Sequence, residues 1–244
     1  MTTASLRHIP LLCEQQELRQ ITGDTLRPGG LELTRRAMEF CALPARSTVL
    51  DVGCGYGQTM ALLAARFGLA PTGLDPAPAM LRQAACRCPG LPLIQADAAA
   101  IPVQNDFFAA LISECVLSLT DNMPASLQEM RRVLAPGGKL VLTDIYARKP
   151  DALPQAQPSE IRSCFDGALP LDTIKAHLRA AGFAIQLLED HTARLRQLAG
   201  QIIFSCGSLA AFWQLFMGAD KAASTCSSLA TAKPGYYLLI AEKE

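Results

Sequence analysis

The chain has 244 residues, half of them hydrophobic, which suits one large α/β domain with a sizeable core. Its 22 basic and 22 acidic side chains cancel, and they form no Lys/Arg run. This argues against nucleic acid as a partner, because proteins that bind it usually carry a basic patch. No apolar run reaches the roughly 18 residues of a membrane span, and the N-terminus lacks a signal-peptide layout. We therefore expect a cytoplasmic protein that does not act at a membrane.

The nine cysteines are expected to be reduced thiols in that compartment. None belongs to a Cys-x-x-Cys pair, and the closest two, Cys86 and Cys88, are only two residues apart. A structural zinc site needs such spacing, so we predict no metal.

The predicted elements alternate along most of the chain. The first is a helix over 31–43, which Pro44 closes. Next come strands over 48–52, 70–74, 91–95, 107–112 and 139–143, with helices over 58–67, 78–86 and 124–134. A helix over 171–181, a strand over 183–188, two apolar helices within 192–217 and a strand over 236–241 complete the chain. Such alternation is typical of a mostly parallel, doubly wound sheet with helices on both faces.

The most informative motif is Asp51-Val52-Gly53-Cys54-Gly55-Tyr56-Gly57, between a predicted strand and a predicted helix. Glycines permit a tight turn and the close approach of a ligand, and amides at the start of the helix would face that ligand. Nicotinamide-binding chains usually show G-x-G-x-x-G, whereas position 58 here is Gln58. The acidic residue before the glycines suits S-adenosylmethionine, which carries an ammonium and a sulfonium but no pyrophosphate.

Two further acidic residues follow the next two strands. Asp75 ends the second strand, where a carboxylate can accept hydrogen bonds from both ribose hydroxyls, and Asp97 follows the third, where it could accept from an adenine amino group. With Asp51, these residues predict one crevice at the carboxyl ends of the strands.

Residues 47–143 resemble a class I S-adenosylmethionine-dependent methyltransferase. The resemblance implies a Rossmann-like, seven-stranded sheet in the order 3-2-1-4-5-7-6 with an antiparallel last strand. It also implies S-adenosylmethionine as cofactor and a small-molecule acceptor. The expected cofactor-binding residues are Asp51, Gly53, Gly55, Gly57, Asp75, Pro76, Met80, Asp97, Ala98 and Glu114. We divide the chain into an N-terminal helical cap (1–46), the cofactor-binding core (47–150) and a third segment (151–244) with an acceptor-site lid, helices and the last two strands.

Segments after the fourth and fifth strands are similar to arsenite methyltransferases. They are Cys115-Val116-x-x-Leu119 and Asp144-x-Tyr146-Ala147, and a third, Cys164-x-x-Gly167-Ala168-Leu169, precedes the next helix. The cysteine of the third segment binds arsenic in that family, so the resemblance implies an acceptor site containing Cys115, Tyr146 and Cys164. Cys206 or Cys226 is a candidate for a second thiol. Trivalent arsenic prefers thiolates and attacks the methyl with its own lone pair, so no general base is needed.

Other functions stay open. Two cysteines of the arsenite methyltransferases have no counterpart here, since Thr59 and Met60 stand at one place and Pro234 and Gly235 at the other. An O-, N- or C-methyltransferase of an organic metabolite would need a base such as His191 or Glu114. A non-catalytic module that binds S-adenosylmethionine is a further alternative.

Four further expectations concern single residues and the oligomeric state. His191 is more simply a loop residue than a base, and the aromatic residues around Trp213 are more simply core or dimer contacts than an acceptor pocket. The catalytic residue is unknown, and the chain is expected to be a monomer or a homodimer.

Overall fold

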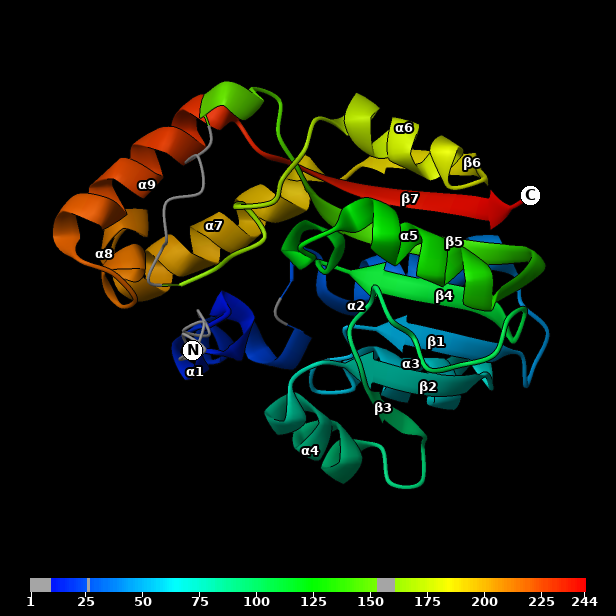
Figure 1. The fold of residues 1–244 in the computed structure, drawn as a ribbon. Coiled ribbons are helices and arrows are strands. Elements are labelled where there is room, and N and C mark those ends of the chain that lie inside the picture. The colour runs from blue at the N-terminus through cyan, green and yellow to red at the C-terminus, as the bar shows by residue number, and fades with distance from the viewer. Residues whose placement is uncertain (1–9, 26, 153–160) are drawn as a thin grey trace, which may run out of the picture.

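The computed structural model describes residues 10–25, 27–152 and 161–244. Its strands form one seven-stranded sheet in the order β3-β2-β1-β4-β5-β7-β6 (Figure 1). They are β1 (Thr48–Val52), β2 (Ala70–Asp75), β3 (Leu93–Gln95), β4 (Phe108–Glu114), β5 (Leu134–Tyr146), β6 (Phe183–Asp190) and β7 (Gly235–Lys243). Strands β1 to β5 pair in parallel, and β7 runs antiparallel to both β5 and β6. The predicted fold class and strand order are therefore confirmed.

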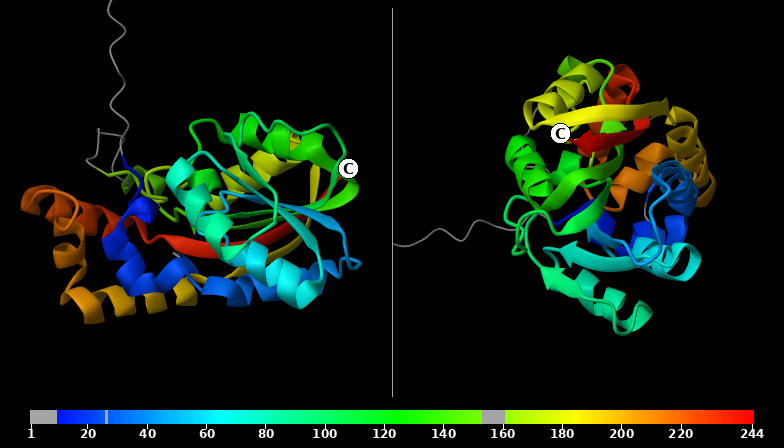
Figure 2. Two further views of the ribbon diagram at one scale, coloured as in Figure 1. Left: turned by 90° about the horizontal axis from the view of Figure 1, so that it is seen from below. Right: turned by 90° about the vertical axis from the view of Figure 1, so that its right-hand side faces the viewer.

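Helices cover both faces of this sheet (Figure 2). The helices of the described ranges are α1 (Gln16–Thr22), α2 (Gly30–Cys41), α3 (Gln58–Phe67), α4 (Pro78–Arg87), α5 (Met123–Val133), α6 (Leu171–Ala180), α7 (Thr192–Cys206), α8 (Leu209–Gln214) and α9 (Ala219–Ala232). Four short 3₁₀ turns are η1 (Leu12–Glu14), η2 (Gly23–Thr25), η3 (Leu117–Leu119) and η4 (Pro150–Ala152).

Two apolar clusters hold the helices to the sheet. Helices α5 and α6 bury Leu127 and Leu178 against one face, in the cluster that includes Leu111. Helices α2 and α3 bury Met38 and Leu63 in the cluster on the other face. Because neighbouring residues of a strand point to opposite faces, a strand buried on both sides is apolar at nearly every position.

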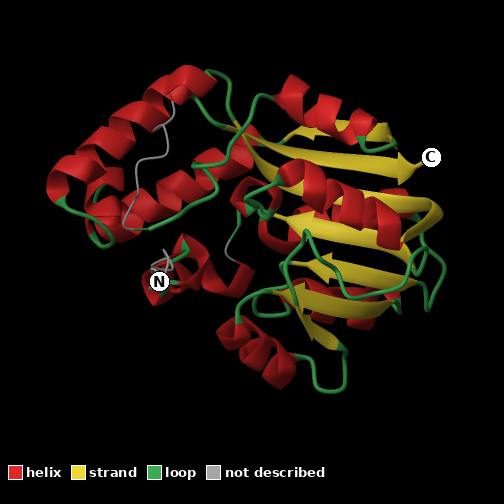
Figure 3. Cartoon of the chain, in the orientation of Figure 1, coloured by secondary structure: helices red, strands yellow, loops and turns green. Residues whose placement is uncertain are grey.

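A group of helices lies beyond the carboxyl ends of the parallel strands. It contains α1, α7, α8 and α9 (Figures 1 and 3). A cluster of its own, with Leu18, Ile202, Phe212, Trp213 and Ala222, holds the group together. This places an apolar layer directly over the edge of the sheet where the strands end.

The differences from the predicted elements have local causes. Strand β5 begins at Leu134, which the sequence predicts to end a helix, because Leu134 pairs with Phe108 of β4. Helix α9 has no counterpart among the predicted elements, because the residues that it packs inward, Ala222, Cys226 and Leu229, are mostly small and lie among serines and threonines. The predicted break between α7 and α8 is confirmed, with Ser208 Oγ accepting from the amide of Ala211 at 3.0 Å. Three prolines within 150–158 predict a loop or lid there, and residues 153–158 of this segment lie outside the described residues.

Candidate functional site

A cavity of about 610 Å³ lies where the parallel strands end. Strands β1, β2 and β4 each place one carboxylate in its wall, namely Asp51, Asp75 and Glu114. The described part of the N-terminal segment contributes Cys13, Glu14, Asp24 and Arg27 from the opposite side. The cavity therefore occupies the crevice that is expected at the carboxyl edge of a doubly wound sheet.

The glycine loop between β1 and α3 forms one wall of this cavity. The amides of Gly53 and Cys54 donate to the carbonyl of Leu74 at 2.7 and 3.0 Å. Gly53 has φ +72°, and a Cβ on it would lie 2.3 Å from a methyl of Val116. Only glycine fits there, because both the backbone angle and the space exclude a side chain.

Gly57 lies further from the cavity than the other two glycines of the motif. It is not among the residues that line the cavity. A Cβ on it would meet Ala84 and Cys88 at 3.2–3.3 Å, and its φ is +77°. Gly57 therefore lets α4 pack closely against the start of α3, and its contact with the cofactor stays a prediction.

Asp75 holds the glycine loop in place. Its Oδ2 accepts from the amide of Gly55 and its Oδ1 from the amide of Ala77, each at 2.9 Å. Burial raises the pKa of this carboxyl, and the two amide bonds oppose that rise. Each oxygen keeps a second lone pair for a ligand hydroxyl.

The remaining predicted cofactor residues also line the cavity. Pro76, Met80, Asp97 and Ala98 lie in its wall. Asp97 Oδ1 accepts from the amide of Ala99 at 2.8 Å, which leaves its other oxygen free for a ligand donor.

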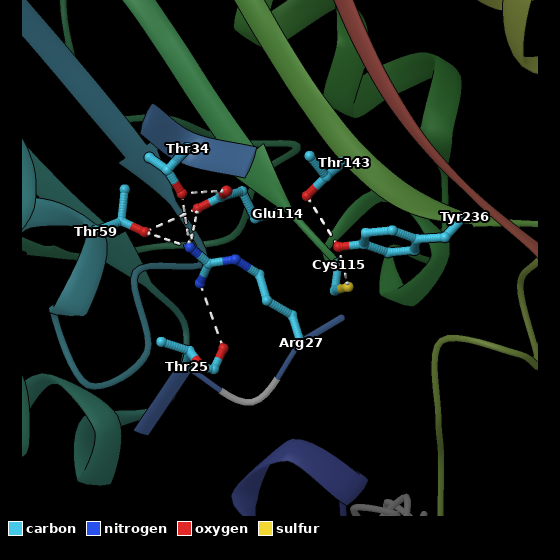
Figure 4. Close-up of polar contacts among 8 residues, drawn as sticks. All are labelled: Thr25, Arg27, Thr34, Thr59, Glu114, Cys115, Thr143 and Tyr236. Carbon is cyan, nitrogen blue, oxygen red and sulfur yellow. Dashed lines mark hydrogen bonds and ion pairs between the residues drawn. The ribbon is translucent and has the colours of Figure 1, made fainter. Parts of the chain in front are cut away.

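A buried ion pair between Arg27 and Glu114 also lies in the wall of this cavity (Figure 4). Arg27 Nη2 is 2.7 Å from Glu114 Oε2, and the two side chains are only 9% and 4% exposed. Thr34 Oγ1 donates to Glu114 Oε1, and Thr59 Oγ1 donates to Glu114 Oε2, both at 2.8 Å. Both oxygens of Glu114 are thus engaged, which makes this residue a poor general base.

Two atoms in this region have no hydrogen-bond partner among the described residues. They are Asp51 Oδ2 and Arg27 Nε, both buried. Burial raises the pKa of Asp51 to about 8, the charge of Glu114 adds to the rise, and Arg27 opposes it. Two carboxylates thus face one guanidinium, so the cavity suits a ligand that brings both a cation and a hydrogen-bond acceptor.

A second cavity, of about 580 Å³, lies under the group of helices. Its walls are mostly apolar and include Phe165, Ile202, Phe212 and Trp213. Trp213 packs against Phe165 and Phe212 with ring centroids 6.4 and 5.4 Å apart. These aromatic side chains therefore serve both as core and as a wall of the second cavity.

The two cavities share part of their walls. Cys13, Cys115, Leu119 and Arg162 line both of them. Cys115 has the unusual φ of +57° for a residue with a side chain, which turns the chain sharply after β4. Cys115 Sγ lies 3.3 Å from Tyr236 Oη, which in turn donates to Thr143 Oγ1 at 3.0 Å (Figure 4).

Asp144 at the end of β5 fixes the turn that carries Leu119. Its Oδ2 accepts from the amide of Ser118 at 2.9 Å, and its Oδ1 accepts from the Ser118 hydroxyl at 2.6 Å. Burial raises the pKa of Asp144 to about 6, and the bonds from Ser118 oppose that rise. The boundary between the cavities is therefore held by buried polar contacts.

Cysteines are frequent around the second cavity. Cys13, Cys115, Cys164 and Cys226 all line it, whereas Cys206 lines neither cavity and packs in the apolar cluster of the helices. Burial raises the pKa of the Cys115 and Cys164 thiols well above the ordinary value. Of the two candidates for a second thiol, Cys226 lines this cavity and Cys206 does not.

Tyr146 and His191 both lie away from the cavities. Tyr146 belongs to the core of the sheet, and its hydroxyl donates to Asp190 Oδ2 at 3.0 Å. The side chain of Tyr146 packs against Gly235, and its contact with an acceptor stays a prediction. His191 Nε2 lies 3.0 Å from Glu189 Oε2, next to the start of α7, which favours the loop residue over the base.

Sequence reasoning missed Arg27 and Cys13. Both come from an N-terminal segment whose residues show no motif, and only their position in the folded chain brings them to the cavities. The turn Arg27-Pro28-Gly29-Gly30 was the one feature in the sequence that could have drawn attention to Arg27.

Comparison with known proteins agrees with this geometry. Residues 50–142 match the family model described as a methyltransferase domain. The uncharacterized methyltransferase YodH of Bacillus subtilis is 32% identical over 162 residues, which cover 64% of this chain and 68% of that protein. The chain belongs to the class I S-adenosylmethionine-dependent methyltransferases.

Two further similar proteins differ in their acceptors. An arsenite methyltransferase of Halobacterium salinarum is 30% identical over 155 residues, covering 59% of this chain but only 39% of that protein. A structure of phosphoethanolamine N-methyltransferase 2 from Haemonchus contortus, with phosphomonomethylethanolamine and S-adenosylhomocysteine, shares the fold with a TM-score of 0.69 at 18% identity. The matched region covers 93% of this chain and 56% of the chain in that structure. No helix in the described ranges is long and apolar enough to cross a membrane.

The raised pKa of Asp51 predicts a pH dependence of stability. An unfolded Asp has a pKa near 3.9, so the folded protein favours the protonated form between about pH 4 and 8. The free energy of unfolding of the ligand-free protein should therefore contain a contribution that falls across this window and is flat above it. Asp51→Asn should lack that contribution, whereas the exposed Asp220→Asn should keep it. Denaturant unfolding at several pH values measures it, and parallel curves for wild type and Asp51→Asn would contradict the assignment.

Proposed function

We propose that this methyltransferase transfers the methyl group of S-adenosylmethionine to a small organic acceptor with a mostly apolar body. The observation that carries the proposal is the meeting of two cavities at Cys115 and Leu119. The crevice at the strand ends would hold the cofactor, and the apolar cavity would hold the acceptor. Their shared wall is where the methyl group would cross.

The cofactor-binding residues are assigned from their places in the crevice. Asp75 would accept from the ribose hydroxyls, and Gly53 and Gly55 would let the cofactor approach the backbone. Pro76 and Met80 would pack near the adenosine, and Asp97 with the Ala98 amide would contact the adenine edge. Glu114 would act through Arg27, and Gly57 through the packing of α3 and α4.

The amino-acid end of the cofactor fits the two unpartnered atoms. Its carboxylate would accept from Arg27 Nε, and its ammonium would donate to Asp51 Oδ2. An opposite charge next to each group compensates for its removal from water. The ammonium would also balance the second carboxylate of the pair Asp51 and Glu114. Arg27 would thereby bring the N-terminal segment into the cofactor site.

A truncated ligand tests the role of Arg27. Removing the carboxylate from S-adenosylhomocysteine, which leaves S-adenosyl-3-thiopropylamine, should weaken binding to the wild type by about 1.5–3 kcal/mol, as for a lost charged hydrogen bond. In the paired variant Arg27→Gln/Glu114→Gln, which removes one charge of each sign, the two ligands should bind alike. Calorimetry measures both affinities. An equal loss in wild type and variant would exclude Arg27 as the carboxylate ligand.

The chemistry needs little from the protein besides placement. The acceptor's nucleophile forms a bond to the methyl as the carbon–sulfur bond of the sulfonium breaks. No His, Asp or Glu in the described ranges lines the acceptor cavity. The acceptor would therefore attack with a free lone pair or in an already ionised form, and catalysis would rest on in-line positioning.

The rest of the chain would shape this site. In this proposal residues 1–46 cap the cofactor crevice, 47–150 form the core, and 151–244 supply the acceptor lid, its helices and the last two strands. The protein would act in the cytoplasm as a monomer or homodimer without nucleic acid, in keeping with its zero net charge.

Filling the acceptor cavity tests the function. Ala199 on α7 lines it, whereas Ala193 on the same helix is exposed and does not. Ala199→Phe should block methyl transfer from labelled cofactor to apolar acceptors, because the added ring occupies the cavity. The affinity for S-adenosylhomocysteine should not change. Ala193→Phe is the matched control and should retain transfer. Undiminished transfer by a folded Ala199→Phe protein would place the acceptor elsewhere.

A soft, thiol-bound acceptor such as arsenite is the second candidate. It is favoured by the four cysteines around the acceptor cavity. In the described ranges no three His, Cys, Asp or Glu side chains are grouped closely enough to hold a metal ion. Arsenic would therefore be held by two thiols, and Cys115 and Cys164 pack against the same apolar cluster.

Single thiol substitutions distinguish the two candidates. With trivalent arsenic and free thiols, Cys164→Ser and Cys115→Ser should each abolish transfer if arsenic is bound between these sulfurs. Transfer to an apolar organic acceptor and cofactor affinity should persist. Cys41→Ser, outside both cavities, is the control. If wild-type protein does not methylate arsenic, or if both variants still do, the soft acceptor is excluded.

A further inference from the structure

The charged side chains that line the acceptor cavity all have the same sign. The charged side chains in its wall are Arg148, Arg162, Arg196 and Lys233, and no carboxylate within the described ranges accompanies them there. The chain as a whole has equal numbers of acidic and basic residues. The positive lining of this one cavity is therefore a local feature and does not follow from the composition.

Two of the four cations are already paired. Arg148 Nη2 lies 3.0 Å from Asp190 Oδ2, and Arg162 Nη1 lies 2.7 Å from Asp121 Oδ1. The side chains of Arg196 and Lys233 have no hydrogen-bond or ion-pair partner among the residues that the structure describes. Both are exposed where they border the cavity, so their charges are free to meet a ligand.

Three of these cations lie at one end of the cavity, whereas Arg162 lies in the wall shared with the crevice. Thr192 at the start of α7 accepts from Arg148 Nη2 at 3.1 Å, and Arg196 follows Thr192 by four residues, on the same side of the helix. The amide of Lys149 donates to the carbonyl of Ala232 at 3.1 Å, next to Lys233. Arg148, Arg196 and Lys233 therefore converge around Thr192 and the start of β7.

Tyr236 extends from this end of the cavity to the wall shared with the crevice, where the methyl group would be transferred. Its amide donates to Thr192 Oγ1 at 3.3 Å, and its hydroxyl lies 3.3 Å from Cys115 Sγ, in the wall that both cavities share. The cationic end and the boundary with the crevice are thus about one tyrosine side chain apart. Figure 4 shows the hydroxyl of Tyr236 beside Cys115, and most other residues that line the cavity are apolar.

We propose that the methyl acceptor is an organic anion with an apolar body, whose carboxylate or phosphate binds between Arg196 and Lys233. The reacting atom at the other end would lie near Cys115 and Leu119. This inference rests on the proposed function and specifies its substrate class. Apolar walls provide most of the binding, and the two cations select the charge and direction of the acceptor.

The single tryptophan of the chain offers a direct test, because Trp213 lies in the wall of this cavity. In the presence of S-adenosylhomocysteine, its fluorescence is titrated with 4-phenylbutanoate, 4-phenylbutanamide and 4-phenylbutylamine, which share one apolar body. The acid should bind about five to ten times more tightly than the amide, as for two solvent-accessible charge contacts, and the amine should bind most weakly. Comparing the affinities for 3-phenylpropyl phosphate and 4-phenylbutanoate then shows whether this end of the cavity prefers a phosphate or a carboxylate.

Matched variants assign the effect to the two cations. In Arg196→Gln/Lys233→Gln the acid and the amide should bind alike, while the affinity for S-adenosylhomocysteine stays unchanged. Arg66→Gln/Arg179→Gln removes the same charge from exposed positions outside the cavity and should keep the preference for the acid.

The outcomes separate this inference from the proposed function. Equal binding of acid and amide to the wild type, tighter binding of the amine, or a preference for the acid that survives in Arg196→Gln/Lys233→Gln overturns the anionic acceptor. If none of the compounds changes Trp213 fluorescence, and Ala199→Phe still transfers methyl groups, the acceptor cavity itself is refuted.

Discussion

A buried ion pair between Arg27 and Glu114 connects the N-terminal segment to the end of strand β4. Breaking a buried pair by removing one partner typically costs 3–5 kcal/mol, because a charge is left in a low-dielectric interior. Thr34 and Thr59 complete the hydrogen bonds of Glu114, so helices α2 and α3 are joined at the same point. This one contact holds a segment outside the matched family domain against the crevice.

The position of that pair affects both cavities. Arg27 closes one side of the crevice, and Pro28, the next residue, lines the apolar cavity. The main chain of the first described residues lies along the loop before α6, since the Leu12 amide donates to the carbonyl of Arg162 at 2.8 Å. The wall between the two cavities is thus built from three distant parts of the chain, which explains why Cys13, Cys115 and Arg162 meet there.

The proposed cofactor crevice and the acceptor cavity are formed in different ways. In the crevice, strand ends place single carboxylates and the glycine loop supplies amides, so the chemistry is largely set by backbone geometry. Over the acceptor cavity, helices α7 to α9 present mostly apolar side chains, with cations at one end. Such a wall can change its specificity by side-chain replacement without disturbing the sheet.

The sequence by itself determined the sheet, its cofactor edge and the class of enzyme. Alternating apolar segments, the glycines after Asp51, and the acidic residues Asp75 and Asp97 are local patterns whose geometry depends on near neighbours in the chain. Helix α9 is missing from the predicted elements, because its inward stripe of Ala222, Cys226 and Leu229 gives a weaker apolar signal than a stripe of large side chains. The tertiary structure alone decided that Arg27 and Cys13 line the cavities, that Gly57 lies against helix α4, and that Tyr146 and Cys206 line neither cavity. Those outcomes depend on contacts between residues far apart in the sequence, which periodicity and spacing do not encode.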